Sequence, residues 1–287
     1  MTSSASGDSA LRVPSLELND GSVIPQLGFG VYRIGPDATA DAVSLALAAG
    51  YRHVDTARAY RNEAGVGAAV RDLGEWVYVT TKYFEPGGDH GHRDAVAAFE
   101  ESFANLGLDR IDLYLVHWPT AAGEGYLESW RALTELRGTE RCRSVGVSNF
   151  VPEHLDRAVD ATGVVPAVNQ VELHPYFQQR ELREVHARLG VVTEAWGPLG
   201  QGAVLDDPTL REIADAHGRS VAQVVVRWHL QLGTVVIPKS SDPARIRANA
   251  EVGDFALTDR DMAAIEALDR GERVGPDPAT YVMPARR

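Results

Sequence analysis

The stretch Gly50-Tyr51-Arg52-His53-Val54-Asp55-Thr56-Ala57-Arg58-Ala59-Tyr60 predicts a short buried strand that leads into a loop. We expect the strand over His53–Ala57, with Asp55 near its end and Tyr60 on the loop that follows. A carboxylate and a phenol that leave one strand together can converge on a single pocket. Asp-Thr pairs and loop tyrosines are common, so this stretch gains its weight from the rest of the chain.

Two later strand ends carry polar residues in the same way. Lys82 ends the predicted strand Val77–Lys82, and His117 lies near the end of the predicted strand Ile111–Trp118. The run Leu113-Tyr114-Leu115-Val116 is mostly apolar instead of alternating, which is typical of a parallel strand that is buried on both faces. Asp, Tyr, Lys and His are therefore expected to leave three successive strands on one side of a parallel sheet.

Strand and helix patterns alternate along the whole chain. The other expected strands are Leu27–Tyr32, Ser144–Asn149, Ala167–Leu173, Val191–Trp196 and Thr234–Pro238. The expected helices that follow the strands are Asp37–Gly50, Glu63–Leu73, Arg93–Leu106, Tyr126–Leu136, Pro152–Ala161, Gln179–Leu189, Val221–Gln231 and Pro243–Asn249. Eight strand–helix units in 287 residues fit a (β/α)8 TIM barrel better than an open doubly wound sheet.

Further elements flank these units. Asn19-Asp20-Gly21-Ser22 separates two short β patterns and predicts an N-terminal β-hairpin. Extra helices are expected over Asp207–His217 and Asp259–Asp269 near the C-terminus. The segment Gly271–Arg287 is rich in Gly and Pro and is expected to be a loop that helps to form the site. Because no linker-like composition appears, we expect a flexible tail over residues 1–14 and a single domain over residues 15–287.

The composition argues against several classes of protein. The net charge is −12 without a run of Lys or Arg, which disfavours nucleic acid and an anionic membrane as partners. Cys142 is the only cysteine, which fits a reducing compartment. The N-terminus lacks the regions of a signal peptide, and no apolar run approaches the ~20 residues that span a bilayer. We therefore expect a soluble, cytoplasmic protein.

The polar strand ends predict a site for proton transfer, because barrels of this kind carry their active sites at the C-terminal ends of the strands. A free phenol has a pKa of about 10 and donates its proton poorly at neutral pH. We expect Lys82 to lower the pKa of Tyr60 while Asp55 holds Lys82 charged. His117 is expected to polarise a substrate carbonyl oxygen. A structural salt bridge or an ordinary core histidine is the alternative for each residue alone, but four residues at equivalent positions argue against coincidence.

Longer motifs surround these four residues and resemble the aldo-keto reductase family. The matching stretches are Gly50–Ala57 with Tyr60, Asn62 and Glu63, Thr80–Lys82, Asp112–Pro119, Val145–Phe150, Val168–Pro175 and Ile237–Ser240. Glu194–Gly202 is similar to the bacterial branch that includes 2,5-diketo-D-gluconate reductases. The resemblance implies hydride transfer from a nicotinamide to a carbonyl carbon. It also implies a tetrad of Asp55, Tyr60, Lys82 and His117, with Tyr60 as proton donor.

The same resemblance implies NADPH/NADP+ as the cofactor, and no Gly-x-Gly-x-x-Gly fingerprint of a Rossmann fold occurs. It assigns Ser148, Asn149 and Gln170 to the carboxamide of the nicotinamide. Trp196, where most relatives have Tyr, is expected to stack on the nicotinamide ring. The other residues expected around the cofactor are Gly30, Val31, Tyr32, Asp55, Gly197, Pro198, Leu199, Gln201 and Gly202.

A second part of the cofactor site is expected after the last strand. Lys239, Ser240 and Arg245 place two cations and a hydroxyl near one helix N-terminus, which suits a phosphate. A solvated charge pair is the alternative. The family resemblance assigns these residues to the 2′-phosphate of NADPH and Asn249 to the adenine.

The substrate is expected to be a small carbonyl compound, such as a dicarbonyl, a keto-sugar acid or a simple aldehyde. Tyr32, Phe84, His117 and Trp118 are expected to line its pocket, with plain packing as the alternative for Phe84. Relatives of this family are usually monomers, so a monomer is expected here. A non-catalytic barrel that senses NADPH is the second hypothesis. A metal hydrolase is a weak third, because His90-Gly91-His92 lies in a Gly/Asp-rich loop and no metal site is expected.

Overall fold

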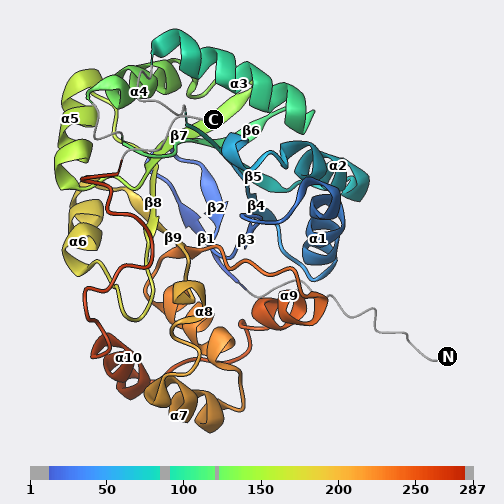
Figure 1. Ribbon diagram of the computed structural model, residues 1–287, viewed down its shortest axis with the longest axis vertical. Coiled ribbons are helices and arrows are strands. Elements are labelled where there is room, and N and C mark those ends of the chain that lie inside the picture. The colour runs from blue at the N-terminus through green and yellow to red at the C-terminus, as the bar shows by residue number, and fades with distance from the viewer. Residues whose placement is uncertain (1–12, 85–90, 120–122, 282–287) are drawn as a thin grey trace.

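The mostly apolar strands pair in parallel and close into a barrel (Figure 1). The computed structural model describes residues 13–84, 91–119 and 123–281. Each barrel strand pairs with the next one along the chain. A parallel bridge between Leu27 and Val236 joins the first and last strands, and the Gly28 amide donates to the Val236 carbonyl at 2.9 Å. The predicted (β/α)8 barrel is confirmed. Its strands are β3 (Phe29–Gly30), β4 (His53–Asp55), β5 (Tyr78–Tyr83), β6 (Ile111–Val116), β7 (Cys142–Ser148), β8 (Val168–Glu172), β9 (Val192–Trp196) and β10 (Val235–Val236).

The helices surround the barrel (Figure 1). Two short 3-10 helices, η1 (Arg58–Tyr60) and η2 (Gly200–Gly202), follow β4 and β9. The bounds of α2 and α8 are as predicted, and each of the other helices differs from the prediction by one to three residues at one or both ends. No described helix has both the length and the apolar composition that a membrane crossing requires. The α-helices are α1 (Pro36–Ala48), α2 (Glu63–Leu73), α3 (His92–Leu106), α4 (Gly125–Leu136), α5 (Pro152–Thr162), α6 (Arg180–Leu189), α7 (Pro208–His217), α8 (Val221–Gln231), α9 (Pro243–Ala250) and α10 (Asp259–Glu266).

The first and last barrel strands are shorter than the sequence predicts. β3 covers Phe29–Gly30 within the expected Leu27–Tyr32, and β10 covers Val235–Val236 within the expected Thr234–Pro238. Both strands border the seam where the barrel closes. Pro238 has no amide hydrogen to extend the ladder beyond the C-terminal end of β10, although its carbonyl accepts from the Gly30 amide at 3.2 Å.

The predicted N-terminal hairpin is confirmed and fills one end of the barrel. β1 (Ser15–Glu17) and β2 (Val23–Pro25) pair antiparallel. Leu18 and Ile24 of this hairpin are buried against Tyr78 and other apolar residues near the N-terminal ends of the barrel strands. Because the hairpin covers the N-terminal end of the barrel, polar side chains that form a site are expected at the C-terminal ends of the strands.

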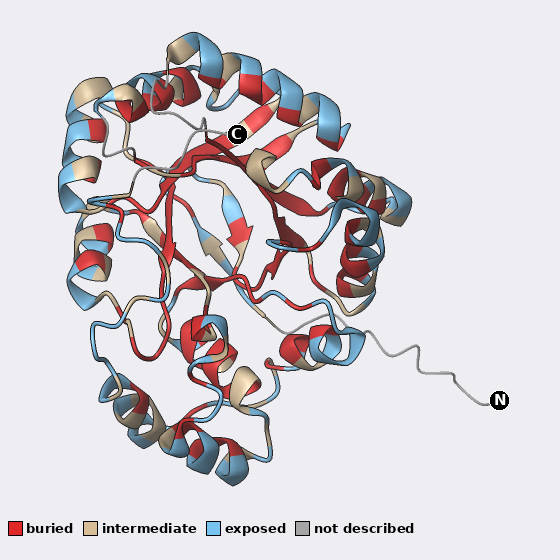
Figure 2. Cartoon of the chain, viewed as in Figure 1, coloured by how far each residue is buried: buried red, intermediate tan, exposed pale blue. Residues whose placement is uncertain are grey.

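Burial follows the amphipathic patterns of the sequence (Figure 2). In α4, Tyr126, Trp130 and Leu133 share one helix face and are buried, whereas the outward face carries exposed charges. Burying one large apolar side chain of this kind contributes about 1.5–3 kcal/mol. This packing fixes the strands, and with them the residues at their C-terminal ends.

Candidate active site

Asp55 and Lys82 form a buried ion pair at the ends of two neighbouring strands. The parallel register places Asp55 of β4 opposite Thr80 of β5, so Lys82 lies just beyond it on the same inner face. Lys82 Nζ donates to Asp55 Oδ1 at 2.6 Å and to the Thr56 carbonyl at 2.8 Å. Gln170 Nε2 donates to the other oxygen, Asp55 Oδ2, at 2.8 Å. The expected pairing of Asp55 with Lys82 is confirmed, and both carboxylate oxygens are occupied.

Tyr60 lies at the end of the 3-10 turn η1, next to this ion pair. The turn is held by Asn62, whose side chain accepts from Thr56 Oγ1 at 2.7 Å and donates to the Val31 carbonyl at 3.0 Å. Lys82 Nζ lies 5.2 Å from the centre of the Tyr60 ring. The structure therefore brings the phenol and the ammonium together, although Lys82 directs its hydrogen bonds to Asp55 and Thr56.

The expected lowering of the Tyr60 pKa is not what the structure shows. Burial raises the pKa of Tyr60 well above its ordinary value, and the negative charge of Asp55 raises it further. The physical reason is that Asp55 Oδ1 lies 2.6 Å from Lys82 Nζ, so the carboxylate offsets the effect of the Lys82 charge on the phenol. Tyr60 consequently keeps its proton at neutral pH in the protein alone.

His117 follows β6 and faces Tyr60, with ring centres 5.7 Å apart in an edge-on arrangement. Burial lowers the pKa of His117 well below its ordinary value, and the positive charge of Lys82 lowers it further. The imidazole is therefore neutral at physiological pH and can donate one N–H. Its Nδ1 is buried and has no hydrogen-bond partner among the described residues. The four residues predicted from the strand ends thus lie around one point.

Glu194, which appears in the sequence only within a motif, is a second buried acid near Asp55. It lies on the inner face of β9, and neither carboxyl oxygen has a hydrogen-bond partner among the described residues. Its nearest charged partner would be His53, 3.8 Å away, but burial lowers the pKa of His53 to about 3. Burial and the charge of Asp55 raise the pKa of Glu194 to about 8. Because Asp55 has the ammonium contact, we assign the charge to Asp55 and the proton to Glu194.

The substitution Glu194→Gln should stabilise the protein above pH 5 and have little effect at pH 4. Glu194 binds a proton in the folded state up to about pH 8, whereas in the unfolded chain it loses that proton near pH 4.5. The stability of the wild type should therefore fall as the pH rises through this window, and a glutamine removes that loss. Urea unfolding at pH 4 and pH 8 measures the effect, which we expect to reach a few kcal/mol at pH 8. If the two proteins differ in free energy of unfolding by the same amount at pH 4 and pH 8, Glu194 is not protonated in the folded state.

The residues expected around the nicotinamide form one hydrogen-bonded network. Ser148 Oγ donates to the Gln170 carbonyl at 2.8 Å, and Asn149 Nδ2 donates to the His117 carbonyl at 3.0 Å. Trp196 Nε1 donates to Asn149 Oδ1 at 2.8 Å, which fixes the half-buried indole at the end of β9. Asn149 has a φ of 63°, a conformation that asparagine tolerates better than most residues. The link between Trp196 and Asn149 was not expected from the sequence.

The loop after β9 leaves room beside its backbone. Gly197 has a φ of 60°, and nothing lies within 4 Å of the position that a Cβ would take. Gln201 at the turn η2 also has a positive φ, 53°, and its side chain is exposed. Open space at Gly197 next to the indole of Trp196 fits a large dinucleotide that passes along this loop. Of the other expected cofactor residues, Pro198 is buried and Leu199 and Gly202 are half-buried in this loop, whereas Gly30 and Val31 are buried at the end of β3.

The expected phosphate site lies at the start of α9, but the helix amides there are already occupied. Lys239 and Arg245 are exposed, whereas Ser240 and Asn249 are buried. Asp242 caps the helix and accepts from the amides of residues 244 and 245 at 2.9 Å each. Asp242 therefore occupies these two helix amides, and the expected phosphate contacts stay with the side chains of Lys239, Ser240 and Arg245. The exposed ammonium and guanidinium groups remain and fit an additional phosphate.

Aromatic rings surround the tetrad. Tyr32 is 51% exposed and its ring centre lies 5.0 Å from that of Tyr60, whereas Phe84 is buried and packs edge-on against His117. Trp118 packs against Tyr281, with ring centres 4.6 Å apart. The sequence analysis did not single out Tyr281, although it expected the C-terminal loop to reach the site. An aromatic residue in that loop was the signal available.

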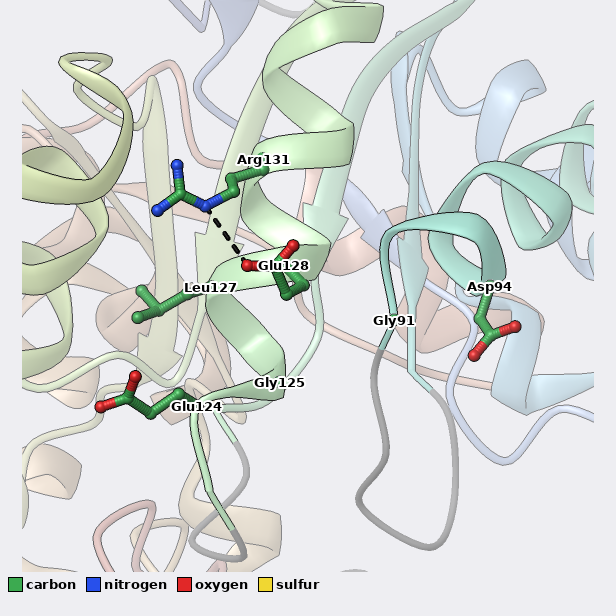
Figure 3. A pocket seen from close by; sticks show the side chains of 7 residues that line it. All are labelled: Gly91, Asp94, Glu124, Gly125, Leu127, Glu128 and Arg131. Carbon is green, nitrogen blue, oxygen red and sulfur yellow. Dashed lines mark ion pairs between the residues drawn. The ribbon is translucent and has the colours of Figure 1, made fainter.

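A groove of about 550 Å³ lies elsewhere, between the beginnings of α3 and α4 (Figure 3). Its walls carry Asp94, Glu124 and Glu128, and Glu128 pairs with Arg131 at 3.4 Å. None of the residues predicted for the site lines this groove.

The structure offers no support for the metal hydrolase. Among the described residues no group of His, Cys, Asp or Glu has the arrangement of a metal site. His90 lies outside the described residues, and His92 pairs with Glu135 at 3.0 Å. The geometry at the strand ends is instead that of a buried ion pair, a phenol and a neutral imidazole, which can hold and transfer a proton.

Comparison of this chain with known proteins points to one family. The model of the Aldo/keto reductase family matches residues 26–270. An aldo-keto reductase of Mycobacterium sp. (strain KMS) is 52% identical over 94% of this chain and 99% of its own length. Methylglyoxal reductase DkgA of Escherichia coli (strain K12) is 44% identical over 93% of this chain and 97% of its own.

Comparison with solved structures points to the same family. The crystal structure of a Gox0644 mutant in complex with NADPH superimposes with a TM-score of 0.90 at 49% identity, over 94% of this chain and 98% of that chain. The chain belongs to the aldo-keto reductase family and is an NADPH-dependent oxidoreductase that reduces aldehydes and ketones to alcohols.

Proposed function

We propose that Tyr60 is the proton donor of this reductase and that Asp55, Lys82 and His117 support it. The observation that carries this proposal is the convergence of the Tyr60 ring, the Lys82 ammonium and the neutral His117 at one set of strand ends. When bound, NADPH would supply the hydride that the carbonyl carbon accepts. His117 donates an N–H to the carbonyl oxygen and orients it. As negative charge develops on that oxygen, Tyr60 Oη transfers its proton, so the product is a neutral alcohol.

The Asp55–Lys82 pair supports this transfer by stabilising the phenolate that it leaves. When Tyr60 loses its proton, the phenolate lies beside the Lys82 ammonium, whose charge stabilises it. Asp55 and the Thr56 carbonyl keep that ammonium in place throughout. The pair therefore acts on the anionic product of the proton transfer, although it does not lower the pKa of Tyr60 at rest.

For the cofactor we propose contacts along the network already described. Ser148, Asn149 and Gln170 would hold the carboxamide of the nicotinamide, and Trp196 would stack on its ring. Residues 30–32 and 197–202 would flank the rest of the dinucleotide, with Asn249 at the adenine. The half-buried indole, the open space at Gly197 and the exposed cations near α9 support these assignments.

We propose a small aldehyde or a dicarbonyl compound as the substrate, with keto-sugar acids as the third class to test. Tyr32 and Trp118 offer apolar ring faces around the polar centre, and Phe84 packs behind His117. The name of the DkgA relative, a methylglyoxal reductase, supports a dicarbonyl. The test is NADPH consumption, followed at constant enzyme, with methylglyoxal, a simple aldehyde and a keto-sugar acid. NADPH binding without consumption of any of the three would instead favour the NADPH sensor.

We also propose that residues 15–287 form one domain that works as a monomer in the cytoplasm. The support is that all four tetrad residues come from one chain and meet without a second copy. The expected tail over residues 1–14 lies almost wholly outside the described residues. Light scattering during gel filtration, with and without NADPH, tests the monomer.

The substitution Arg245→Ala should weaken NADPH binding by about tenfold or more and leave NADH binding almost unchanged. A charge-assisted hydrogen bond contributes about 1.5–3 kcal/mol, and about 1.4 kcal/mol is a factor of ten. The nearby Asp242 carboxylate opposes a phosphate, so the preference should rest on the side chains of Lys239, Ser240 and Arg245. Quenching of tryptophan fluorescence gives both dissociation constants. Arg247→Ala, on the same helix, is the matched control, and equal losses for both cofactors would show that Arg245 does not contact the 2′-phosphate.

A further inference from the structure

A buried carboxylate ties the C-terminal loop, Gly271–Tyr281, to the barrel. Glu172 ends β8 and is fully buried. Its Oε1 accepts from the Val274 amide at 2.5 Å, and its Oε2 accepts from the Gly275 amide at 2.9 Å. The imidazole of His174 lies 3.0 Å from Oε1. One side chain of the barrel thus accepts two consecutive amides of a segment about a hundred positions later in the chain.

The charge state of Glu172 fits this role. Burial alone raises the pKa of Glu172, but hydrogen bonds from His174, Val274 and Gly275 outweigh it, and the net pKa lies below the ordinary value. The carboxylate is therefore ionised at neutral pH, and both oxygens act as acceptors. Hydrogen bonds to an ionised acceptor are the stronger kind.

The same loop lies directly against the indole of Trp196. A Cβ on Gly275 would lie only 2.5 Å from Trp196 Cη2 and 2.8 Å from Glu172 Oε2. Real side chains do not tolerate such distances, so the backbone reaches the ring only because residue 275 is glycine. Trp196 is thus held by the loop at its ring edge and by Asn149 at its nitrogen.

The C-terminal loop is hydrogen-bonded to the barrel before Gly275 and reaches the tetrad after it. The carbonyl of Tyr176 accepts from the amides of Arg270 and Glu272 at 3.1 Å each, and the Arg270 guanidinium lies 4.0 Å from the centre of the Tyr176 ring. Beyond Gly275 the chain returns to the tetrad, where Tyr281 packs on Trp118. In Figure 1 this segment runs from α10 across the side of the barrel that carries α6.

We propose that Glu172 is a positioning residue whose carboxylate holds the C-terminal loop against Trp196, so that the loop and the indole form one preassembled wall of the substrate site. This inference rests on the proposed stacking of Trp196 on the nicotinamide and on the proposed substrate site beside Tyr32 and Trp118. Glu172 itself touches no reacting atom and acts through the amides of Val274 and Gly275. Ordering the loop in advance lowers the entropic cost of binding the carbonyl compound.

The first test needs neither cofactor nor substrate. In Glu172→Gln the amide group of the new side chain must face one of the two backbone N–H groups, so one hydrogen bond is lost. Hydrogen–deuterium exchange of the segment 271–281 should become about tenfold faster or more, and trypsin should cut faster at Arg270 and Arg273. Val274→Ala is the matched control, because the Val274 side chain is exposed while its amide keeps the contact. Exchange equal to that of the control would overturn the inference.

The second test uses Gly275→Ala, which displaces the loop without changing the carboxylate. Both variants should raise KM for methylglyoxal, or for whichever carbonyl the wild type reduces, by about tenfold, with kcat less affected. Unfolding temperatures should stay close to that of the wild type. A large loss of stability with unchanged exchange and KM would make Glu172 a merely structural residue and would overturn the proposal. If the wild type consumes no NADPH at all, the proposed function fails, while the exchange experiment still decides whether Glu172 holds the loop.

Discussion

Tyr60→Phe should reduce carbonyl reduction by at least about a hundredfold, because a positioned general acid contributes about 10²–10⁴ to the rate. The substitution removes the hydroxyl that transfers the proton and leaves the ring. The contacts of that ring with Tyr32 and His117 should persist, so the fold and the binding of NADPH should be almost unchanged. The measurements are kcat/KM for one aldehyde and the dissociation constant of NADPH for both proteins.

Tyr32→Phe is the matched control for this experiment. It also removes a hydroxyl next to the site, and its ring centre lies 5.0 Å from that of Tyr60. We expect a small effect on kcat for this control. Activity of Tyr60→Phe near that of the wild type would contradict the assignment of Tyr60 as the proton donor.

Lys82→Met should destabilise the protein by about 3–5 kcal/mol, because it leaves the buried carboxylate of Asp55 without its partner. It should also remove nearly all activity, since the phenolate of Tyr60 would lose the charge that stabilises it. Residual activity should show a displaced pH profile. The positive charge of Lys82 contributes to the lowered pKa of His117, so its removal raises that pKa and moves the acid limb to higher pH. Urea unfolding and a pH–rate profile measure the two effects.

The double variant Asp55→Asn with Lys82→Met separates structure from catalysis. Replacing both members of a buried pair by neutral groups is often nearly neutral for stability. We therefore expect the double variant to recover most of the lost stability while its activity stays low. Recovery of activity together with stability would show that the pair is only structural.

The barrel and the convergence of Asp55, Tyr60, Lys82 and His117 could be predicted from the sequence for a physical reason. Apolar strands and amphipathic helices leave a periodic signal, and parallel strands in register bring their ends to one edge. The sequence alone therefore predicts that Asp55, Lys82 and His117 lie together. The aldo-keto reductase motifs strengthened this prediction, because they surround the same residues.

Other features depend on neighbours that are distant in the sequence. The pKa of Tyr60 is raised by burial and by the charge of Asp55, whereas the expectation drawn from the sequence rests on the ammonium of Lys82 alone. The orphaned carboxyl of Glu194 became visible only when the strands were closed around it. The contact of Glu172 with the C-terminal loop joins positions too far apart for any local pattern.

One missed feature did leave a local signal. Asp242 precedes Pro243 at the start of a helix, and this Asp-Pro pair is a typical N-terminal cap. The pair predicts that the amides at this helix end are occupied. The side chains of Lys239, Ser240 and Arg245, which the family resemblance assigns to the 2′-phosphate, are then the groups that remain for it.

This chain reduces a carbonyl group with a hydride from NADPH, and we propose that the proton comes from its own Tyr60. The most direct measurement uses NADPH that carries deuterium at both positions of C4 of the nicotinamide, with methylglyoxal or a simple aldehyde as the acceptor and mass spectrometry of the product. We predict an alcohol with one deuterium on the former carbonyl carbon, formed in equal amount to the NADPH consumed, and at least about a hundredfold slower with Tyr60→Phe. Tight binding of NADPH without any deuterated alcohol, or equal rates for the two proteins, would contradict this account.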